Sequence, residues 1–181
     1  MNTQDRYQKA IIYAAGKHNE GNQTVKGTDL PYVVHVCNVA MEILAADPHT
    51  DDWNLNLAVE TALLHDVIED TSATKEDIIS EFGKETADAV MALTKNEQLP
   101  KADRMKDSLA RIKSLSKEVW SVKIADRITN LQKPPKTWDQ EKKQEYCEQA
   151  QLIYEELKGA NSYLENRLKD KIEAYKAYIF E

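Results

Sequence analysis

The sequence has few of the residues that build loops, turns and covalent cross-links. Its 181 residues include only 5 glycines and 5 prolines, so long loops and many tight hairpins are not expected. The only two cysteines, Cys37 and Cys147, belong to no CxxC or Cys/His ligand spacing. This pattern predicts free thiols in a reducing compartment and argues against a disulfide framework.

Basic surfaces and long hydrophobic runs are also missing. The net charge of −7 argues against a nonspecific nucleic-acid partner, because such a protein needs a basic face to displace counterions. The chain has no signal-peptide pattern and no run of about 18 apolar residues, so no membrane partner and a cytoplasmic location are expected. An anionic small molecule stays compatible, since a metal ion or a few lysines can reverse the charge inside a pocket.

Apolar residues recur at helical spacing along almost the whole chain. A chain of this length can bury one core without staples, so residues 1–181 are predicted to form a single all-α domain, a bundle of about seven to nine helices. The polar residues 17–30 are predicted to be a functional loop. Helices are expected over about 55–67, 104–114, 117–131, 139–157 and 161–180, with Thr74 as the N-cap of a further one.

The segment "ALLHDVIEDT", residues 62–71, ends an apolar run with a histidine and three acids. On a continuous helix, His65 would lie over Glu69, four residues later. In the same way Asp66 would lie over Asp70. At an effective dielectric near 20, two unit charges about 5 Å apart repel by roughly 3 kcal/mol, and a divalent cation would relieve that repulsion. The segment therefore predicts one part of a metal site.

Further ligands must come from elsewhere in the chain. His35 lies among valines in "YVVHVCNVA", and Asp126 lies in the apolar segment "VWSVKIADRITNL". Two imidazole nitrogens and two carboxylate oxygens would leave open positions on a six-coordinate ion and favour manganese, iron or zinc over calcium. Taken singly, His35 could be a hydrogen-bonded core residue, and Asp126 could pair with a basic residue of its own segment. His18 and His49 lie in polar stretches and are expected to be exposed and not to be ligands.

The spaced pattern H…HD…D resembles that of the HD-domain metal-dependent phosphohydrolases. More narrowly, "HDVIEDT" resembles the HDxxEDT motif of the RelA/SpoT-type hydrolase domain. The segments "LPYVVHV", "LPKADRMK", "VKIADRITNL" and "KKQEYCEQAQLI" look like further blocks of that family. The similarity runs from about residue 5 to 175, so the chain is most similar to the small, stand-alone alarmone hydrolases, which include the metazoan SpoT homologue.

The resemblance implies a single HD hydrolase domain over residues 1–181. Its activity would be manganese-dependent removal of the 3′-pyrophosphate of (p)ppGpp, or of a related alarmone, in a stress (stringent) response. Fe²⁺ or Zn²⁺ are the alternative metals, and a small-molecule nucleotide is the implied substrate. The implied metal ligands are His35, His65, Asp66 and Asp126; the catalytic pair is Glu69 and Asp70; the substrate-binding residues are Lys26, Lys101, Asn130, Lys142 and Tyr146.

One position departs from the family pattern. The family often has GQxRK before its PY, and the arginine stacks on guanine, whereas "NQTVKGTDLPY" has Val25 there and keeps the lysine as Lys26. A valine offers no cation–π stacking to a purine. The base preference therefore stays open between guanine, adenine and another 3′-phosphorylated nucleotide.

Two alternative functions remain at this stage. The chain could be an HD enzyme of another class, acting on other nucleotides or on the 2′-phosphate of NADPH. It could also be a degenerate HD domain that binds a nucleotide without turnover. For Lys101 and Lys142 the structural alternative is plain surface charge, and for Tyr146 it is helix packing. Monomer and homo-oligomer are both compatible with the sequence.

Overall fold

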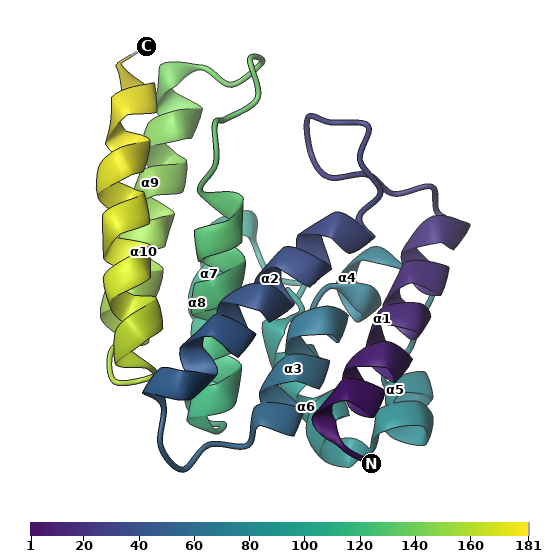
Figure 1. Cartoon of the computed structure of the whole chain (residues 1–181). Helices are drawn as coiled ribbons and strands as arrows, with labels where there is room; N and C mark the ends of the chain where they lie inside the picture. The colour runs from purple at the N-terminus through teal and green to yellow at the C-terminus, as the bar shows by residue number, and fades with distance from the viewer. Residues whose placement is uncertain (181) are drawn as a thin grey trace.

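The computed structural model describes residues 1–180, and within them the chain is helical with no β-strand. The elements are α1 (Thr3–Glu20), α2 (Val33–Ala46), η1 (Asp47–His49), α3 (Leu55–Leu64), α4 (Val67–Asp70), α5 (Lys75–Phe82), α6 (Lys84–Leu93), α7 (Lys101–Lys113), α8 (Lys117–Asn130), α9 (Gln140–Glu156), α10 (Ser162–Tyr175) and η2 (Lys176–Ile179) (Figure 1). Since α4 is a single four-residue turn, nine longer α-helices remain, which confirms the all-α prediction.

Two helices, α3 and α8, form the centre of the fold. In α3 every residue from Leu57 to Leu64 is buried, as expected for a helix that is apolar on all sides. Most of α8 from Glu118 to Ile128 is buried as well. The helix α2 packs against both of them (Figure 1). These three helices therefore form one rigid unit, and each carries part of the predicted metal site.

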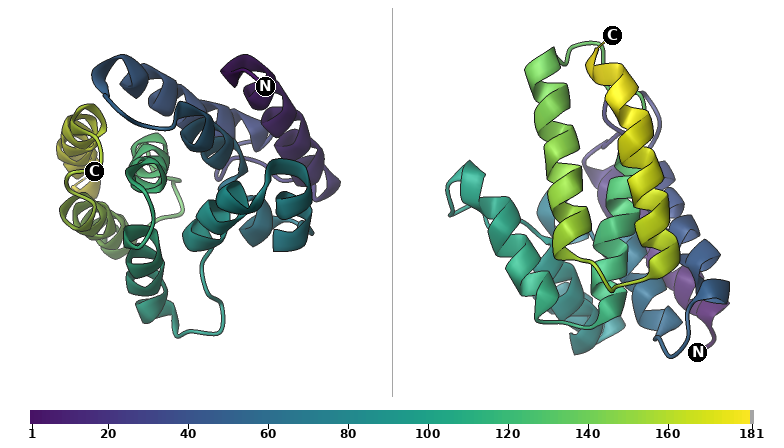
Figure 2. Two further views of the ribbon diagram at one scale, coloured as in Figure 1. Left: turned by 90° about the horizontal axis from the view of Figure 1, so that it is seen from below. Right: turned by 90° about the vertical axis from the view of Figure 1, so that its left-hand side faces the viewer.

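The remaining helices cover this centre from two sides. On one side α9 and α10 run antiparallel to each other and pack on α8, as Figure 2 shows. On the other side α1 and α6 pack against α3, and α5 and α7 pack on α6. Among the described residues, no helix is long and apolar enough to cross a membrane.

A buried charge joins three of these helices. Glu60 in α3 is 4% exposed, forms an ion pair with Arg6 of α1 at 2.9 Å and accepts a hydrogen bond from the Thr86 hydroxyl of α6 at 3.1 Å. A buried carboxylate is tolerated only when it has such partners. Glu60 thus aligns α1 and α6 against the central helix.

The first helix is longer than predicted. It was expected to end before residue 17, but α1 continues to Glu20. Ala10, Ala14 and His18 are buried at intervals of four residues, so they form one inward stripe. His18 belongs to this stripe although the segment around it is polar. The connecting segment is therefore 21–32, shorter than the predicted loop.

Thr74 is the N-cap of α5, as predicted, and forms a capping box. Its hydroxyl accepts the backbone N–H of Asp77 at 3.2 Å, and the Asp77 carboxylate accepts the backbone N–H of Thr74 at 2.9 Å. Thr74→Ala is expected to lower the free energy of unfolding by about 1 kcal/mol, measured by urea denaturation. As a matched control, the exposed Ser80→Ala in the same helix should stay within about 0.5 kcal/mol of the parent. A Thr74→Ala protein as stable as the parent would show that the box contributes nothing.

Candidate active site

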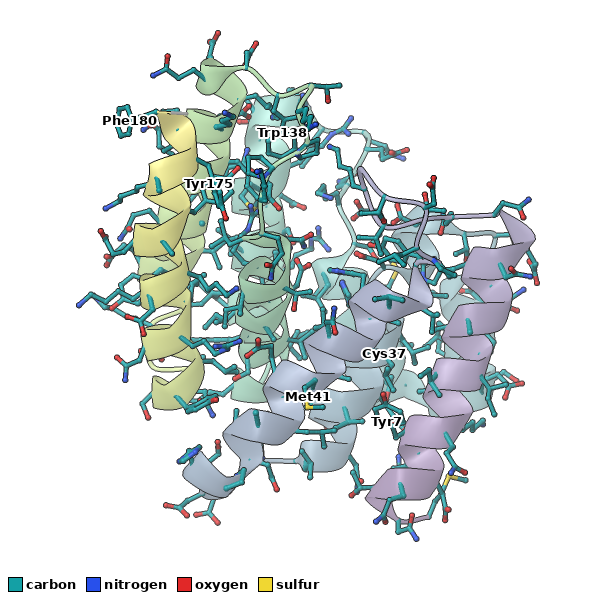
Figure 3. All side chains as sticks on the ribbon, turned by 45° about the horizontal axis from the view of Figure 1, so that its top comes forward. Tyr7, Cys37, Met41, Trp138, Tyr175 and Phe180 are labelled. Carbon is teal, nitrogen blue, oxygen red and sulfur yellow. The ribbon has the colours of Figure 1, made fainter. Side chains whose placement is uncertain are left out.

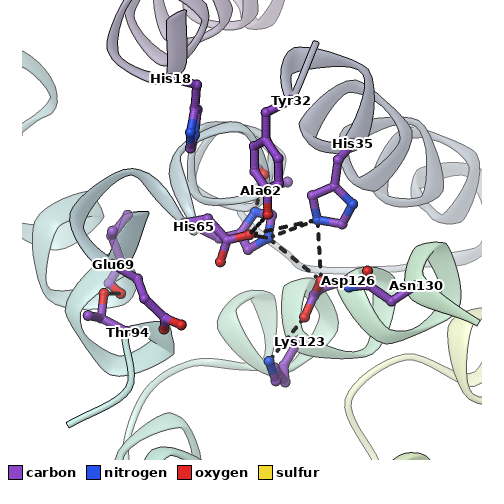
Figure 4. A network of polar contacts seen from close by, with 12 residues as sticks. His18, Tyr32, His35, Ala62, His65, Glu69, Thr94, Lys123, Asp126 and Asn130 are labelled. Carbon is purple, nitrogen blue, oxygen red and sulfur yellow. Dashed lines mark hydrogen bonds and ion pairs between the residues drawn. The ribbon is translucent and has the colours of Figure 1, made fainter. Parts of the chain in front are cut away.

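Three helices bring their predicted ligands to one point. His35 lies in the first turn of α2, His65 directly follows α3, and Asp126 lies in the last turn of α8. His35 Nε2 lies 3.4 Å from His65 Nε2 and 3.4 Å from Asp126 Oδ1, and His65 Nε2 lies 3.7 Å from Asp126 Oδ1 (Figure 4). All three residues are buried, and one ligand atom from each lies within 4.8 Å of the others. The structure thus brings together residues that are far apart in the chain.

The fourth predicted ligand, Asp66, lies next to this cluster. Its Oδ2 is 2.9 Å from His65 Nε2 and 3.8 Å from His35 Nε2, and it accepts a hydrogen bond from the Tyr32 hydroxyl. The prediction that residues 55–67 form one helix is wrong here, because α3 ends at Leu64. Asp66 has φ −103° and ψ −2°, and α4 starts after it. At this break in the helix the Asp66 carboxylate faces the two imidazoles.

The donor set fits a divalent ion. The Nδ1 of His65 lies 2.8 Å from the Ala62 carbonyl oxygen, so Nδ1–H donates there and the Nε2 lone pair faces the cluster. Ligand atoms about 2.1 Å from an ion and at right angles to one another are roughly 3 Å apart. The observed 3.4 Å between the two Nε2 atoms is close to that value. Two imidazole nitrogens and two carboxylates are a set that transition-metal ions prefer.

The electrostatics of the cluster also favour a bound cation. Burial lowers the pKa of His65, but the charges of Asp66 and Asp126 outweigh it and raise that pKa well above its ordinary value. Burial raises the pKa of Asp126, but Lys123 and the two histidines outweigh it and hold that pKa well below its ordinary value. Both carboxylates therefore stay ionised, and without an ion a proton on His65 Nε2 supplies the positive charge that a metal ion would replace on binding.

The two predicted catalytic carboxylates differ in their surroundings. Glu69 forms an ion pair with the Lys95 ammonium and accepts the Lys95 backbone N–H at 2.8 Å, so it faces the segment after α6 (Figure 4). Loss of hydration at the cleft wall, followed by the charges of Asp66 and Glu69, raises the pKa of Asp70 to about 6. The Glu69 carboxylate is thus held in an ion pair with Lys95, whereas the Asp70 carboxyl can exchange a proton near neutral pH.

A cleft of about 640 Å³ opens from the His–His–Asp cluster. Of the predicted substrate-binding residues, Lys26, Asn130 and Tyr146 line it. Asn130 also donates a hydrogen bond to Asp126 Oδ1 and so helps to orient that ligand. The volume is within the range of small-molecule sites.

Lys142 forms an ion pair with Glu145 at 2.5 Å, and neither Lys142 nor Lys101 is among the described residues that line the cleft. The hydrogen bond and charge of Lys142 hold the pKa of Glu145 below its ordinary value. The role of the two lysines in binding phosphate stays a prediction.

The segment 21–32 reaches across the mouth of the cleft. Val25 and Lys26 line the cleft, and the Lys26 ammonium lies 4.9 Å from the ring centroid of Trp138 on the opposite wall. At the tip, Gly27 has φ +79°, and a Cβ there would lie 3.3 Å from Pro135 Cγ. Only glycine combines this backbone conformation with so close an approach.

His18 was expected to be exposed, and this prediction is wrong: it is 2% exposed. Its ring lies 4.6 Å from that of Tyr32, and its Nδ1 contacts the amide oxygen of Gln23. Gln23 in turn donates a hydrogen bond to the Asp70 carbonyl. These contacts tie α1 and the segment 21–32 to the acidic turn of α4. The four-residue spacing from Ala14 is the signal in the sequence that indicates burial. His49 is exposed, as expected.

This helical fold, with its cluster of two histidines and an aspartate, defines the class of protein. The HD domain family matches residues 10–162, and the chain belongs to that family. The chain is similar to guanosine-3′,5′-bis(diphosphate) 3′-pyrophosphohydrolase MESH1 from Danio rerio, with 33% identity over 166 residues and 89% of each chain covered. The Drosophila melanogaster MESH1 is 31% identical over 169 residues, covering 91% of this chain and 92% of the relative.

A solved structure shows the same likeness in three dimensions. It is that of a metazoan ortholog of SpoT that hydrolyses ppGpp. The two folds superpose with a TM-score of 0.80 at 31% identity, covering 93% of this chain and 94% of the other. The chain is therefore an enzyme, an HD-domain hydrolase related to MESH1, and its His–His–Asp cluster is the candidate site for a divalent metal.

Proposed function

We propose that this protein removes the 3′-pyrophosphate of (p)ppGpp, or of a related alarmone, in a manganese-dependent reaction that releases pyrophosphate. The observation that carries the proposal is the cluster of His35, His65 and Asp126 at one end of a nucleotide-sized cleft. It is supported by MESH1 relatives that match 89% of the chain. The enzyme would act as one domain over residues 1–181, in the cytoplasm and in a stress response.

Four residues of the site would bind the metal ion. His35, His65, Asp66 and Asp126 would hold the ion, with Mn²⁺ proposed and Fe²⁺ or Zn²⁺ as the alternatives for this mixed nitrogen and oxygen set. When bound, the ion supplies an activated water near neutral pH and polarises a phosphoryl oxygen.

Asp70 would accept the proton of the attacking water, because the pKa of its carboxyl is raised to about 6. Glu69, held by Lys95, would help to orient that water. Lys26, at the mouth of the cleft, would bind a phosphate group. Lys101 and Lys142 are proposed to bind phosphate oxygens at the outer edge, where the substrate would replace Glu145 as the partner of Lys142.

The direct test is turnover of ppGpp by the full chain after loading with manganese. The expected products are GDP and pyrophosphate, separated by ion-exchange chromatography and measured by ³¹P NMR. A chelator-treated sample should be inactive and should recover when manganese is added back. A fully manganese-loaded protein that leaves ppGpp intact would contradict the proposal. A protein that retains less than about one-tenth of an equivalent of metal would favour a nucleotide-binding domain without turnover.

Val25 favours a second candidate substrate. It lines the cleft and offers only apolar contact, so nothing at this position selects guanine by cation–π stacking. An adenine alarmone is therefore an alternative, as is the 2′-phosphate of NADPH. A panel of ppGpp, its adenine analogue and NADPH discriminates these cases by the ratio of their kcat/KM values. Release of orthophosphate from NADPH in place of pyrophosphate from an alarmone would assign the protein to the phosphatase alternative.

A further inference from the structure

A charged side chain of the cleft has no partner in the described part of the chain. Arg127 in α8 is 5% exposed and lines the cleft, and its Nε and Nη1 atoms have no hydrogen-bond partner among residues 1–180. Its guanidinium lies over the ring of Tyr146, 4.3 Å from the centroid. An arginine is always charged, and a buried charge without a counterion is unfavourable. The cation–π contact orients the group but does not neutralise it.

The neighbouring acid cannot serve as this counterion. Asp126 already accepts hydrogen bonds from Lys123, at 3.0 Å, and from Asn130, and it faces the two histidines. Successive residues on a helix point about 100° apart, so Arg127 faces α9 while Asp126 faces the metal cluster. No ion pair between Arg127 and an acidic side chain is formed within the described residues.

A second unpartnered donor comes from another helix. Tyr175 of α10 is 2% exposed and lines the same cleft, and its hydroxyl has no hydrogen-bond partner among the described residues. Its ring centroid lies 6.0 Å from that of Tyr146, and the Arg127 guanidinium lies over the same Tyr146 ring. Burial raises the pKa of Tyr175 to about 12, so the hydroxyl keeps its proton and can donate it. Figure 3 shows Tyr175 on α10, at the same end of the molecule as Trp138.

We propose that Arg127 and Tyr175 form an anion subsite in the cleft, separate from the metal cluster, that binds a phosphate group of the substrate. A guanidinium presents paired N–H groups that match two phosphate oxygens, and the tyrosine hydroxyl adds a third donor. The nucleotide nature of the ligand rests on the proposed function, in which the ligand carries two diphosphate groups. The diphosphate that is not cleaved would lie at Arg127, while the reacting one lies at the metal cluster.

The test measures anion binding without turnover. The full chain, stripped of metal with a chelator, is titrated with inorganic pyrophosphate by isothermal calorimetry. Arg127→Met should bind pyrophosphate at least about tenfold more weakly than the parent, because charge-assisted hydrogen bonds are lost. Tyr175→Phe should bind it a few-fold more weakly, by about threefold to tenfold. The matched control is Arg167→Met, since Arg167 pairs with Glu42 on the surface away from the cleft, and its affinity should equal that of the parent.

Thermal unfolding separates a binding role from a structural one. Removing an uncompensated buried charge while keeping an apolar side chain should leave the Tm of Arg127→Met unchanged or raise it. If that variant fails to fold, Tyr175→Phe decides the matter, because it removes only a hydroxyl without a partner. The subsite is overturned if pyrophosphate binds the folded variants within twofold of the parent, or if the parent shows no binding at millimolar pyrophosphate.

The anion subsite and the proposed function can fail separately, because pyrophosphate binding and ppGpp hydrolysis are measured in different experiments. Loss of pyrophosphate binding in the variants, together with a parent that does not hydrolyse ppGpp, would keep the subsite and reject the alarmone substrate. Hydrolysis of ppGpp by the parent, together with unchanged pyrophosphate binding in the variants, would reject the subsite alone.

Discussion

Asp66→Ala is expected to abolish divalent-metal binding and turnover together. The Asp66 carboxylate lies 2.9 Å from His65 Nε2, at the edge of the cluster, and is the predicted fourth ligand. Its removal takes away one of the two anionic donors, and manganese is at the weak end of the affinity order for divalent ions, so we expect the ion to be lost on dialysis. Metal content after manganese loading and dialysis, measured by plasma mass spectrometry, gives the first readout. The rate of ppGpp hydrolysis gives the second.

The exposed Asp51→Ala serves as the control for this experiment, since it also removes one acidic charge but lies in the loop before α3. It should keep the metal content and rate of the parent. Circular dichroism should show that Asp66→Ala keeps its helices, because the removed side chain is not part of the apolar core. A full equivalent of bound manganese in Asp66→Ala would show that Asp66 is not a ligand.

Asp70→Asn is expected to lower kcat by about 10²- to 10⁴-fold while leaving the bound metal in place, which is the usual effect of removing a general base. In the parent, the pKa of Asp70 is raised to about 6 by loss of hydration and by the charges of Asp66 and Glu69. The base form dominates above that pH, so the rate should fall as the pH drops through about 6. Asp70→Asn should lose this acidic limb of the pH–rate profile.

Glu69→Gln is the matched comparison, since it changes the other acid of the same turn from carboxylate to amide. It disrupts the ion pair with Lys95 and should reduce the rate while keeping the acidic limb of the profile. If the limb disappears in Glu69→Gln and persists in Asp70→Asn, the roles of the two carboxylates are reversed. Equal activity of both variants and the parent would remove the acid–base proposal.

The helical class and the residues of the His–His–Asp cluster could be predicted because both depend on local sequence patterns. Helical spacing of apolar residues is visible within a dozen positions, and it predicted α8 at 117–131 where the structure has Lys117–Asn130. A histidine or an aspartate within an apolar run is likewise conspicuous without any structure, as His35 and Asp126 were. The match of the chain to the HD domain family agrees with that reading.

The errors occurred where a tertiary contact overrides a local preference. His18 looks like a loop residue, yet it is buried against Tyr32 and prolongs α1. The segment around Asp66 has helical spacing, yet the chain turns at Asp66, where its carboxylate meets Tyr32 and His65. Tyr32 is far along the chain from both His18 and Asp66, so no local sequence pattern reveals these two contacts.

The helical class and the residues His35, His65 and Asp126 can be recognised from the sequence alone, because residue types and helical periods are properties of short segments. Which charged groups have partners follows only from how the helices pack. The tertiary structure pairs Glu69 with Lys95 and Lys142 with Glu145, and it leaves Arg127 without an acidic partner among the described residues. Whether a buried charge is satisfied depends on helices far apart in the chain, and no local pattern records that relation.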